Sequence, residues 1–241
     1  MKKAAMFLAG AFFALTAAAQ EKTERIQGNG ENTKEKREVS AGFDQVKVTG
    51  NFNVVLVSGQ TGTITLEGEE NLISQITTDV SEGELAISSG NKLLISSRNK
   101  KITVKVPVDD ISRITLKGSG CIDVRPTMHA DVELTLDGCG QIKAYVAAAK
   151  VKACVLGNGE ISISGKAADF ECRVVGSGSV KAYGVESPLV NALVSGSGNV
   201  EANSTKAVKG RISGSGNIAF VGEPKETDLK HSGTGKFTLH Q

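Results

Sequence analysis

The chain has 241 residues, with 28 glycines, four prolines, eight phenylalanines, two tyrosines and no tryptophan. Its formal net charge is +2 at pH 7, from 28 lysines and arginines against 26 acidic residues. This balance gives no electrostatic basis for binding nucleic acid, which we therefore exclude as an expected partner.

The first twenty residues, MKKAAMFLAGAFFALTAAAQ, have the pattern of a secretory signal peptide. Two lysines precede an apolar run, and Ala17-Ala18-Ala19 supplies a small-residue cleavage site. The run is shorter than the roughly 20 apolar residues of a membrane-spanning helix, so we expect no transmembrane segment. With residues 1–19 as the signal peptide, we predict export to the periplasm, the cell surface or the medium.

Residues 20–38 are polar and without periodicity, and we interpret them as a flexible leader. From Val39 onward, apolar and polar residues alternate in stretches such as FDQVKVTG, FNVVLVSG and KITVKVPV. Alternation with period two predicts strands. We therefore place one β domain at 39–241 and treat 39–117 as its irregular part.

From Gly118 to the end, the sequence repeats about every 19 residues. Each repeat carries two glycines that flank one small residue. These pairs are Gly118 and Gly120, Gly138 and Gly140, Gly157 and Gly159, Gly176 and Gly178, Gly196 and Gly198, Gly214 and Gly216, and Gly233 and Gly235. The spacing predicts regular coils over 118–241.

Aliphatic residues keep fixed places relative to each pair. Four residues after the first glycine lie Ile122, Ile142, Ile161, Val180, Val200, Ile218 and Phe237. Stacked coils place such residues above one another at about 4.8 Å, because neighbouring strands have that spacing. The sequence thus predicts an all-β fold, a single-stranded β-helix (β-solenoid) with about 19 residues per coil. The glycines would form its tight structural corners, where a side chain has no room or φ is positive.

The chain resembles the family of the putative auto-transporter adhesin, head GIN domain. The resemblance lies in REVSAGFDQVKVTGNFNVVLVSG, GELAISS, KITVKVPV and the recurring G-S-G-x-[IV], and it spans 39–241. It implies a β-helical envelope or secreted domain with an adhesin label, and it supplies no catalytic or ligand residues to transfer.

The sequence offers little for catalysis. Strands both precede and follow each G-x-G, whereas a phosphate loop leads into a helix. No Cys/His spacing matches a metal site, so we expect no metal and no cofactor. The four cysteines lie at positions that favour free thiols over a disulfide. No two neighbouring coils align carboxylates in the columns that we compared, which disfavours an enzyme.

Tyr145 and Tyr183 both lie seven residues after a corner glycine, two coils apart. Together with Lys143 and Lys181 they form a candidate ligand-binding stripe on one outer edge. Two loop tyrosines that pack against their own loops are the competing interpretation.

We therefore expect a non-catalytic, secreted or cell-envelope, adhesin-like module that presents a polar face to an envelope protein or a glycan. The alternative is a carbohydrate-active or ligand-binding β-helix enzyme of the cell envelope. Exposed edge strands at both ends would favour pairing between copies, so we consider a homo-oligomer.

Overall fold

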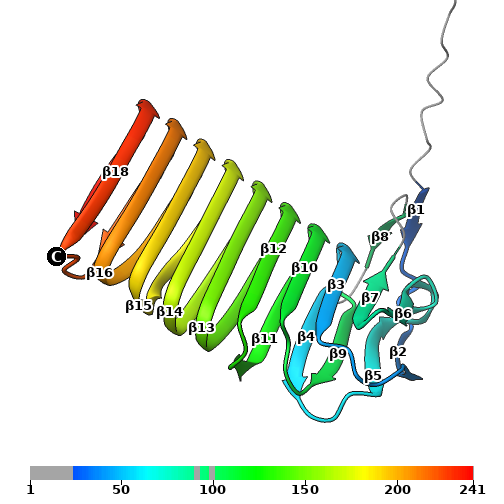
Figure 1. Ribbon diagram of the computed structural model, residues 1–241. Coiled ribbons are helices and arrows are strands. Elements are labelled where there is room, and N and C mark those ends of the chain that lie inside the picture. Colours follow the sequence, from blue (N-terminus) through cyan, green and yellow to red (C-terminus); the bar gives the residue numbers. More distant parts are fainter. Residues whose placement is uncertain (1–23, 90–92, 98–100, 241) are drawn as a thin grey trace, which may run out of the picture.

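The computed structural model describes residues 24–89, 93–97 and 101–240; the predicted signal peptide lies outside them. The chain is 74% strand and 2% helix and forms a β-solenoid of about seven turns, roughly 19 residues apart. The predicted fold class is therefore confirmed. Figure 1 shows the coils stacked in a row, with an irregular cap at the N-terminal end and the C-terminus at the other.

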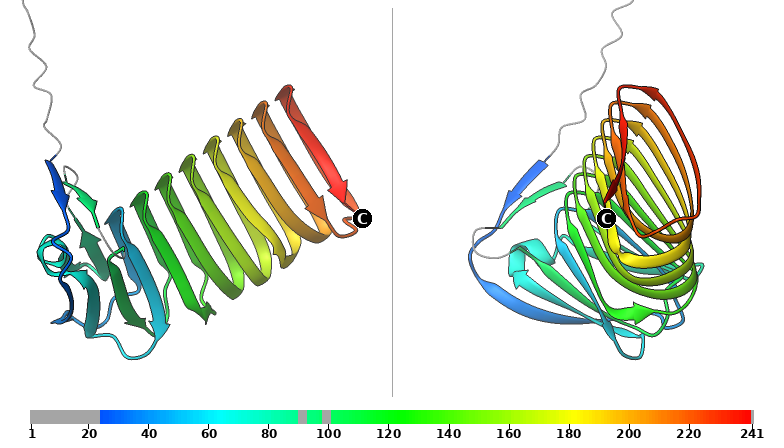
Figure 2. Two further views of the ribbon diagram at one scale, coloured as in Figure 1. Left: turned by 180° about the vertical axis from the view of Figure 1, so that it is seen from behind. Right: turned by 90° about the vertical axis from the view of Figure 1, so that its left-hand side faces the viewer.

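The solenoid has two broad faces. Face A contains the strand segments that precede the glycine corners: β7 (Glu84–Ser88), β3 (Gln45–Gly50), β10 (Arg113–Gly118), β12 (Val132–Gly138), the second halves of β13 (Gln141–Gly157), β14 (Glu160–Gly176), β15 (Ser179–Gly196) and β16 (Asn199–Gly214), and β18 (Glu226–Gly233). Face B contains the segments that follow the corners: β9 (Thr103–Val108), β4 (Asn53–Ser58), β11 (Cys121–Met128), the first halves of β13 to β16, β17 (Asn217–Val221) and β19 (Lys236–His240). Viewed from the C-terminal end, successive coils lie almost on top of one another (Figure 2).

The core is a set of aliphatic rows between the two faces. Ile142 pairs with Ile161, Ile161 with Val180, and Val180 with Val200, all in parallel register. These four side chains are at most 1% exposed. Burial of each such side chain stabilises the fold by about 1.5–3 kcal/mol, so the rows are the main source of stability.

The order of coils in space departs from the order in sequence at the N-terminal end. β3 and β4 stack directly on β10 and β11, although more than 50 residues separate β4 from β10. On their other side, β3 pairs with β7 and β4 with β9. The stretch 39–117 therefore contributes complete coils that continue the regular stack, and the chain leaves this stack after β4 to build the cap.

The elements of the cap are β1 (Glu24–Gln27), β2 (Asn32–Glu38), β5 (Thr63–Glu69), the single helical turn α1 (Glu70–Ile73), β6 (Thr77–Ser81) and β8 (Leu93–Ser96). The cap covers the outermost coil with the antiparallel strands β2, β5 and β6 and with the parallel pair β1 and β8. β5 pairs with β9 and β6 with β7, both antiparallel. These pairings satisfy backbone groups that the coil would otherwise present as open edges.

The prediction of a flexible leader over 20–38 is wrong for its described part. β1 pairs with β8, and β2 pairs with β5 along its whole length. The Arg37 guanidinium donates hydrogen bonds to the carbonyl oxygens of Ile73 (3.0 Å) and Ile76, which fixes β2 against α1. Most β2 side chains are exposed. The strand therefore lacks the buried apolar alternation by which strands are recognised.

Candidate functional site

The narrow edge of the solenoid is formed by the glycine corners. The first glycine of each pair has φ between +114° and +131°, a region that other L-residues rarely adopt. The second glycine meets a different restriction: a Cβ on Gly198 would lie 2.6 Å from the carbonyl oxygen of Gly178 and would overlap Val174 Cγ1. The small residue between them is exposed, and the hydroxyls of Ser197 and Ser215 are 3.0 Å apart in adjacent coils.

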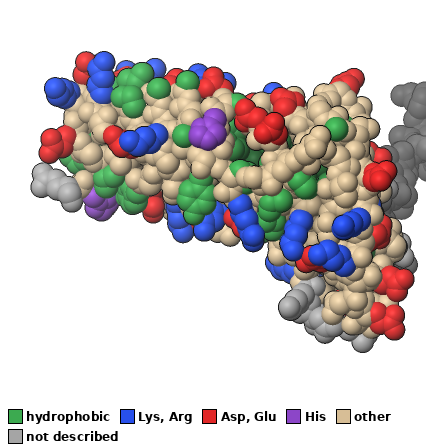
Figure 3. Space-filling model, turned by 90° about the horizontal axis from the view of Figure 1, so that it is seen from below, with side chains coloured by type: hydrophobic (Ala, Val, Ile, Leu, Met, Phe, Trp, Pro, Cys, Tyr) green, Lys and Arg blue, Asp and Glu red, His purple; other side chains and the backbone are tan. Residues whose placement is uncertain are grey.

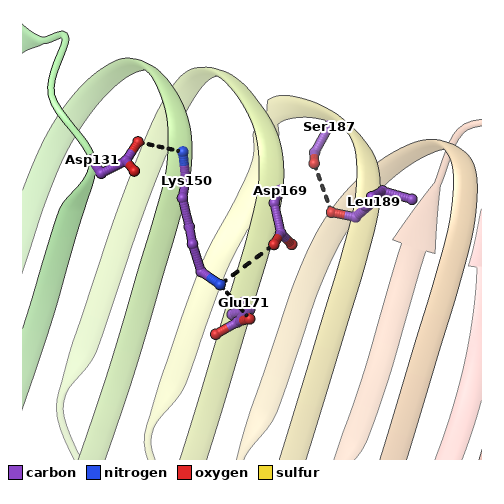
Figure 4. A network of polar contacts seen from close by, with 6 residues as sticks. All are labelled: Asp131, Lys150, Asp169, Glu171, Ser187 and Leu189. Carbon is purple, nitrogen blue, oxygen red and sulfur yellow. Dashed lines mark hydrogen bonds and ion pairs between the residues drawn. The ribbon is translucent and has the colours of Figure 1, made fainter.

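The opposite edge is a wider bend with polar groups inside. Ser187 and Ser204 are completely buried there. Ser187 Oγ donates to the Leu189 carbonyl oxygen at 2.8 Å, as Figure 4 shows, and Ser204 Oγ donates to that of Ala207 at 2.9 Å. These bonds stabilise the bend, and each buried hydroxyl has a hydrogen-bond partner.

Face A carries charges of both signs in register. Lys150 Nζ lies 2.9 Å from Glu171 and 3.5 Å from Asp169, while the Lys150 backbone N–H donates to Asp131 at 2.8 Å (Figure 4). The hydrogen bond to Glu171, more than the nearby charges, raises the pKa of the Lys150 ammonium. The network links three consecutive coils. The Lys150 ammonium is already paired with two carboxylates, so the network has a structural role.

Two shallow depressions lie on face A. The larger, about 450 Å³, has Leu189 and Ala207 among its lining residues, together with the carboxylates of Asp169, Glu226 and Asp228. Register places two strands between Asp169 and Glu226, so their Cα atoms are about 14 Å apart. The hydrogen bond from Arg211 lowers the pKa of Asp228, whereas a general acid needs a raised one.

The second depression, about 260 Å³, includes Cys154 and Cys172. All four cysteines are free. Burial raises the pKa of Cys121 and Cys154 and raises that of Cys172 to about 12. These three thiols are therefore protonated at neutral pH and unsuited to nucleophilic attack. Within the described part of the chain, no cluster of His, Cys, Asp and Glu could hold a metal ion.

The two predicted lysines lie on face B, in one row of paired residues. Lys143 pairs with Ser162 and Ser162 with Lys181. Lys181 Nζ is 2.6 Å from Glu160, whose hydrogen bond raises the pKa of the lysine. Lys143 Nζ lies 6.0 Å from the ring centroid of Tyr145, at the limit of a cation–π contact. Lys181 is therefore already neutralised by a carboxylate, unlike Lys143.

The two predicted tyrosines are not in register with each other. Tyr145 pairs with Ser164, but Ser164 pairs with Gly184 because the register shifts next to it. The ring of Tyr183 instead meets that of His240 edge-on, with centroids 6.2 Å apart. Tyr145 is 41% exposed and remains available beside Lys143.

Sequence reasoning missed a third depression, of about 480 Å³, where the cap meets face B. Its lining includes Lys34, Glu67, Lys101 and Thr103, which come from β2, β5, β9 and the segment before β9. Only the antiparallel pairing of β2, β5 and β9 brings them together. No local pattern in the sequence signals that pairing.

Among the helices of residues 24–89, 93–97 and 101–240, none has the length and apolar character to cross a bilayer. The sequence model described as "Putative auto-transporter adhesin, head GIN domain" matches residues 42–224. No curated protein matches the sequence.

Solved structures share the architecture. A putative adhesin from Bacteroides fragilis is 21% identical with a TM-score of 0.81, over 89% of this chain and 100% of that one. A putative lipid binding protein from Parabacteroides distasonis is 20% identical (TM-score 0.72, 90% and 100% covered). A putative adhesin from the same species is 21% identical (TM-score 0.68, 90% and 99% covered). At these identities the likeness establishes the fold.

Proposed function

Since the chain belongs to the head GIN domain family of putative auto-transporter adhesins, we propose that it is a non-catalytic binding module of the cell envelope. In this proposal its flat faces present polar side chains to an envelope protein or a glycan.

The observation that carries the proposal is the regular, polar surface that the coils build. Outward side chains of adjacent coils are hydrogen-bonded in pairs: Gln141 donates to Glu160 at 3.0 Å, and Asn217 donates to Asn199 at 3.0 Å. Such side chains are held in place before any partner arrives. Preorganisation lowers the entropic cost of binding, which suits a recognition surface.

Binding can be tested with residues 20–241, the chain without its predicted signal peptide. The purified protein is immobilised and exposed to envelope extract and to a glycan array. We expect a specific protein or glycan to be retained, and we expect added soluble protein to compete for it and reduce the retention. Failure to retain anything from either source would contradict the binding role.

Catalysis is tested separately with any glycan that is retained. Incubation with the protein should leave the glycan length unchanged and create no new reducing ends. Release of shorter products, lost in Glu226→Gln, would support the alternative of a carbohydrate-active enzyme and contradict a purely binding role.

A further inference from the structure

The charge of the chain is balanced overall but distributed unevenly in space. On the outer side of β2, β5, β9, β4, β11 and the first half of β13, together with Lys101 just before β9, six cations face three carboxylates that reach the solvent. A fourth carboxylate, Glu69 of β5, is completely buried. The cations are Lys34, Lys36, Lys101, Lys105, Arg125 and Lys143, and the carboxylates are Glu38, Glu67 and Asp123. We call the five lysines of this set the basic patch. Figure 3 shows Lys and Arg side chains following one side of the molecule from its middle toward the cap.

Strand pairing aligns the basic patch along the axis of the solenoid. Lys36 pairs with Thr65 and Thr65 with Lys105. The same row continues through Val55 of β4 and Asp123 of β11 to Lys143. At about 4.8 Å per strand, Lys36 and Lys105 are about 10 Å apart, and Lys105 and Lys143 about 14 Å. Lys36, Lys105 and Lys143 therefore lie on a line about 24 Å long that runs across the strands. The one carboxylate in this line, Asp123, is paired with Arg125.

The carboxylates of this region neutralise only part of the charge. Glu67 lies 3.0 Å from both Lys34 and Lys105, and Asp123 pairs with Arg125 at 3.3 Å. Lys36, Lys101 and Lys143 form no ion pair with any residue that the structure describes. They are also exposed. Three lysines are thus free to meet an anionic partner.

The patch is continuous across the junction of cap and solenoid. The 480 Å³ depression lined by Lys34 and Lys101 lies at one end of it. Both Lys101 and Lys143 act on the Cys121 thiol and lower its pKa, against the larger raising effect of burial. Both ammonium groups therefore lie near Cys121 on face B, as does the Asp123 carboxylate, which raises the pKa of that thiol.

We propose that the basic patch binds a linear anionic polysaccharide, which lies along the solenoid axis from the depression of the cap to Tyr145. This inference rests on the proposed binding function and names the class of its partner. Carboxylate or sulfate groups of the polymer meet Lys36, Lys101 and Lys143. The exposed ring of Tyr145 offers an apolar surface to a sugar ring at the far end.

The surroundings of the patch favour a polysaccharide over other polyanions. Membrane-surface binding combines basic residues with exposed Trp, Phe or Leu, but the exposed leucines of the described chain lie on face A and in β19. Single-stranded nucleic acid is bound by several stacked aromatic rings, whereas Tyr145 is the one tyrosine in this patch. A flat, linear array of charges with one ring matches an acidic sugar polymer.

The test measures binding of residues 20–241 to polygalacturonate and, as a neutral counterpart, to fully methyl-esterified polygalacturonate. We expect binding to the acidic polymer only, weakening with salt as screening shortens from about 10 Å at 0.1 M to about 3 Å at 1 M. The triple variant Lys36→Gln, Lys101→Gln, Lys143→Gln should bind about tenfold more weakly or worse. The matched control Lys117→Gln, Lys152→Gln, Lys209→Gln removes the same charge from face A and should bind like the unchanged protein.

Three results would overturn the inference: no binding of polygalacturonate at low salt, equal weakening in both triple variants, or preference for vesicles of equal parts phosphatidylcholine and phosphatidylglycerol. Circular dichroism of both variants verifies that they are folded. If the array in the first test returns a neutral glycan or a protein instead, the binding function stands and only this partner class fails.

Discussion

At the residue scale, each narrow corner depends on two glycines that serve different needs. Gly196 has φ of +121°, and a Cβ there would also approach the carbonyl oxygen of Gly176 to 2.5 Å. Gly198 lacks the positive φ but is pressed against the preceding coil. Stacking at the strand spacing leaves no alternative position for an added methyl group, because the obstacle is backbone.

Gly196→Val and Gly214→Val should each destabilise the protein by about 3 kcal/mol, from backbone strain and overpacking together. The measurement is chemical denaturation. Ser197→Ala is the matched control in the same corner, and it should cost less than about 1 kcal/mol because it loses a single exposed hydroxyl contact. Unchanged stability in either valine variant would contradict a tight corner.

The buried thiol of Cys172 makes the free energy of unfolding depend on pH. Burial raises the pKa of its thiol from 9.0 to about 12. Below pH 9 both the folded and the unfolded chain keep the proton. Between pH 9 and 12 only the unfolded chain releases it, so rising pH favours unfolding, by up to about 1.4 kcal/mol per pH unit. The measurement is the free energy of unfolding as a function of pH. Near pH 10–11 it should fall more steeply in the unchanged protein than in Cys172→Ala, by up to about 1.4 kcal/mol per pH unit. Parallel pH curves for the two proteins would argue against the buried, protonated thiol.

At the scale of elements, β2 shows why an exposed strand escapes prediction. All seven of its side chains are polar and all but that of Arg37 are exposed, yet its backbone is paired with β5 over seven residues. Arg37 adds hydrogen bonds to two carbonyl groups at the end of α1. The strand is therefore defined by backbone pairing and one guanidinium, and such long-range partners leave no periodic signal.

Arg37→Ala should loosen the cap locally. It leaves the carbonyls of Ile73 and Ile76 without their charged donor, a loss of about 2 kcal/mol. Hydrogen exchange should speed up in residues 70–77 and in β2, with the middle coils unaffected. Lys36→Ala, which changes an exposed neighbour on the same strand, is the control. Equal exchange in both variants would show that Arg37 does not hold the cap.

At the scale of the whole molecule, the solenoid is a stack in which each coil contacts its neighbours. Removal of one complete coil should therefore be tolerated, because the flanking coils present the same rows. Deletion of 160–178 joins Gly159 to Ser179. Gln141, which pairs with Glu160, then meets Ser179, the residue that occupies the same place in the following coil. We expect a folded, cooperative and less stable protein by circular dichroism and thermal unfolding.

Deletion of 160–169 is the out-of-phase control for this experiment. It removes about half a coil, so the rows of aliphatic side chains no longer meet, and we expect loss of the folded state. If both deletions fold equally well, register between coils is not what holds the stack together.

The charge distribution is also a property of the whole molecule. The nearly balanced charge of the chain gave no basis for a nucleic-acid partner, yet pairing gathers lysines on one side of face B. On face A, by contrast, the row Arg113, Glu133, Lys152 and Glu171 alternates in sign. Lys36, Lys105 and Lys143 lie far apart in sequence and share one row of paired strands. Net charge adds up residues without regard to position, whereas an electrostatic field depends on where they lie.

The sequence by itself determined the all-β solenoid, the pitch of about 19 residues and the buried rows such as Ile142 to Val200, because each of these follows from a local period repeated coil after coil. Only the tertiary structure decided the cap and the pairing of β7 with β3 and of β9 with β4. It also decided the offset of Tyr183 from Tyr145 and the lysines gathered between the cap and β13. These features depend on pairings between distant segments and on a one-residue register shift, and neither leaves a periodic trace in the chain.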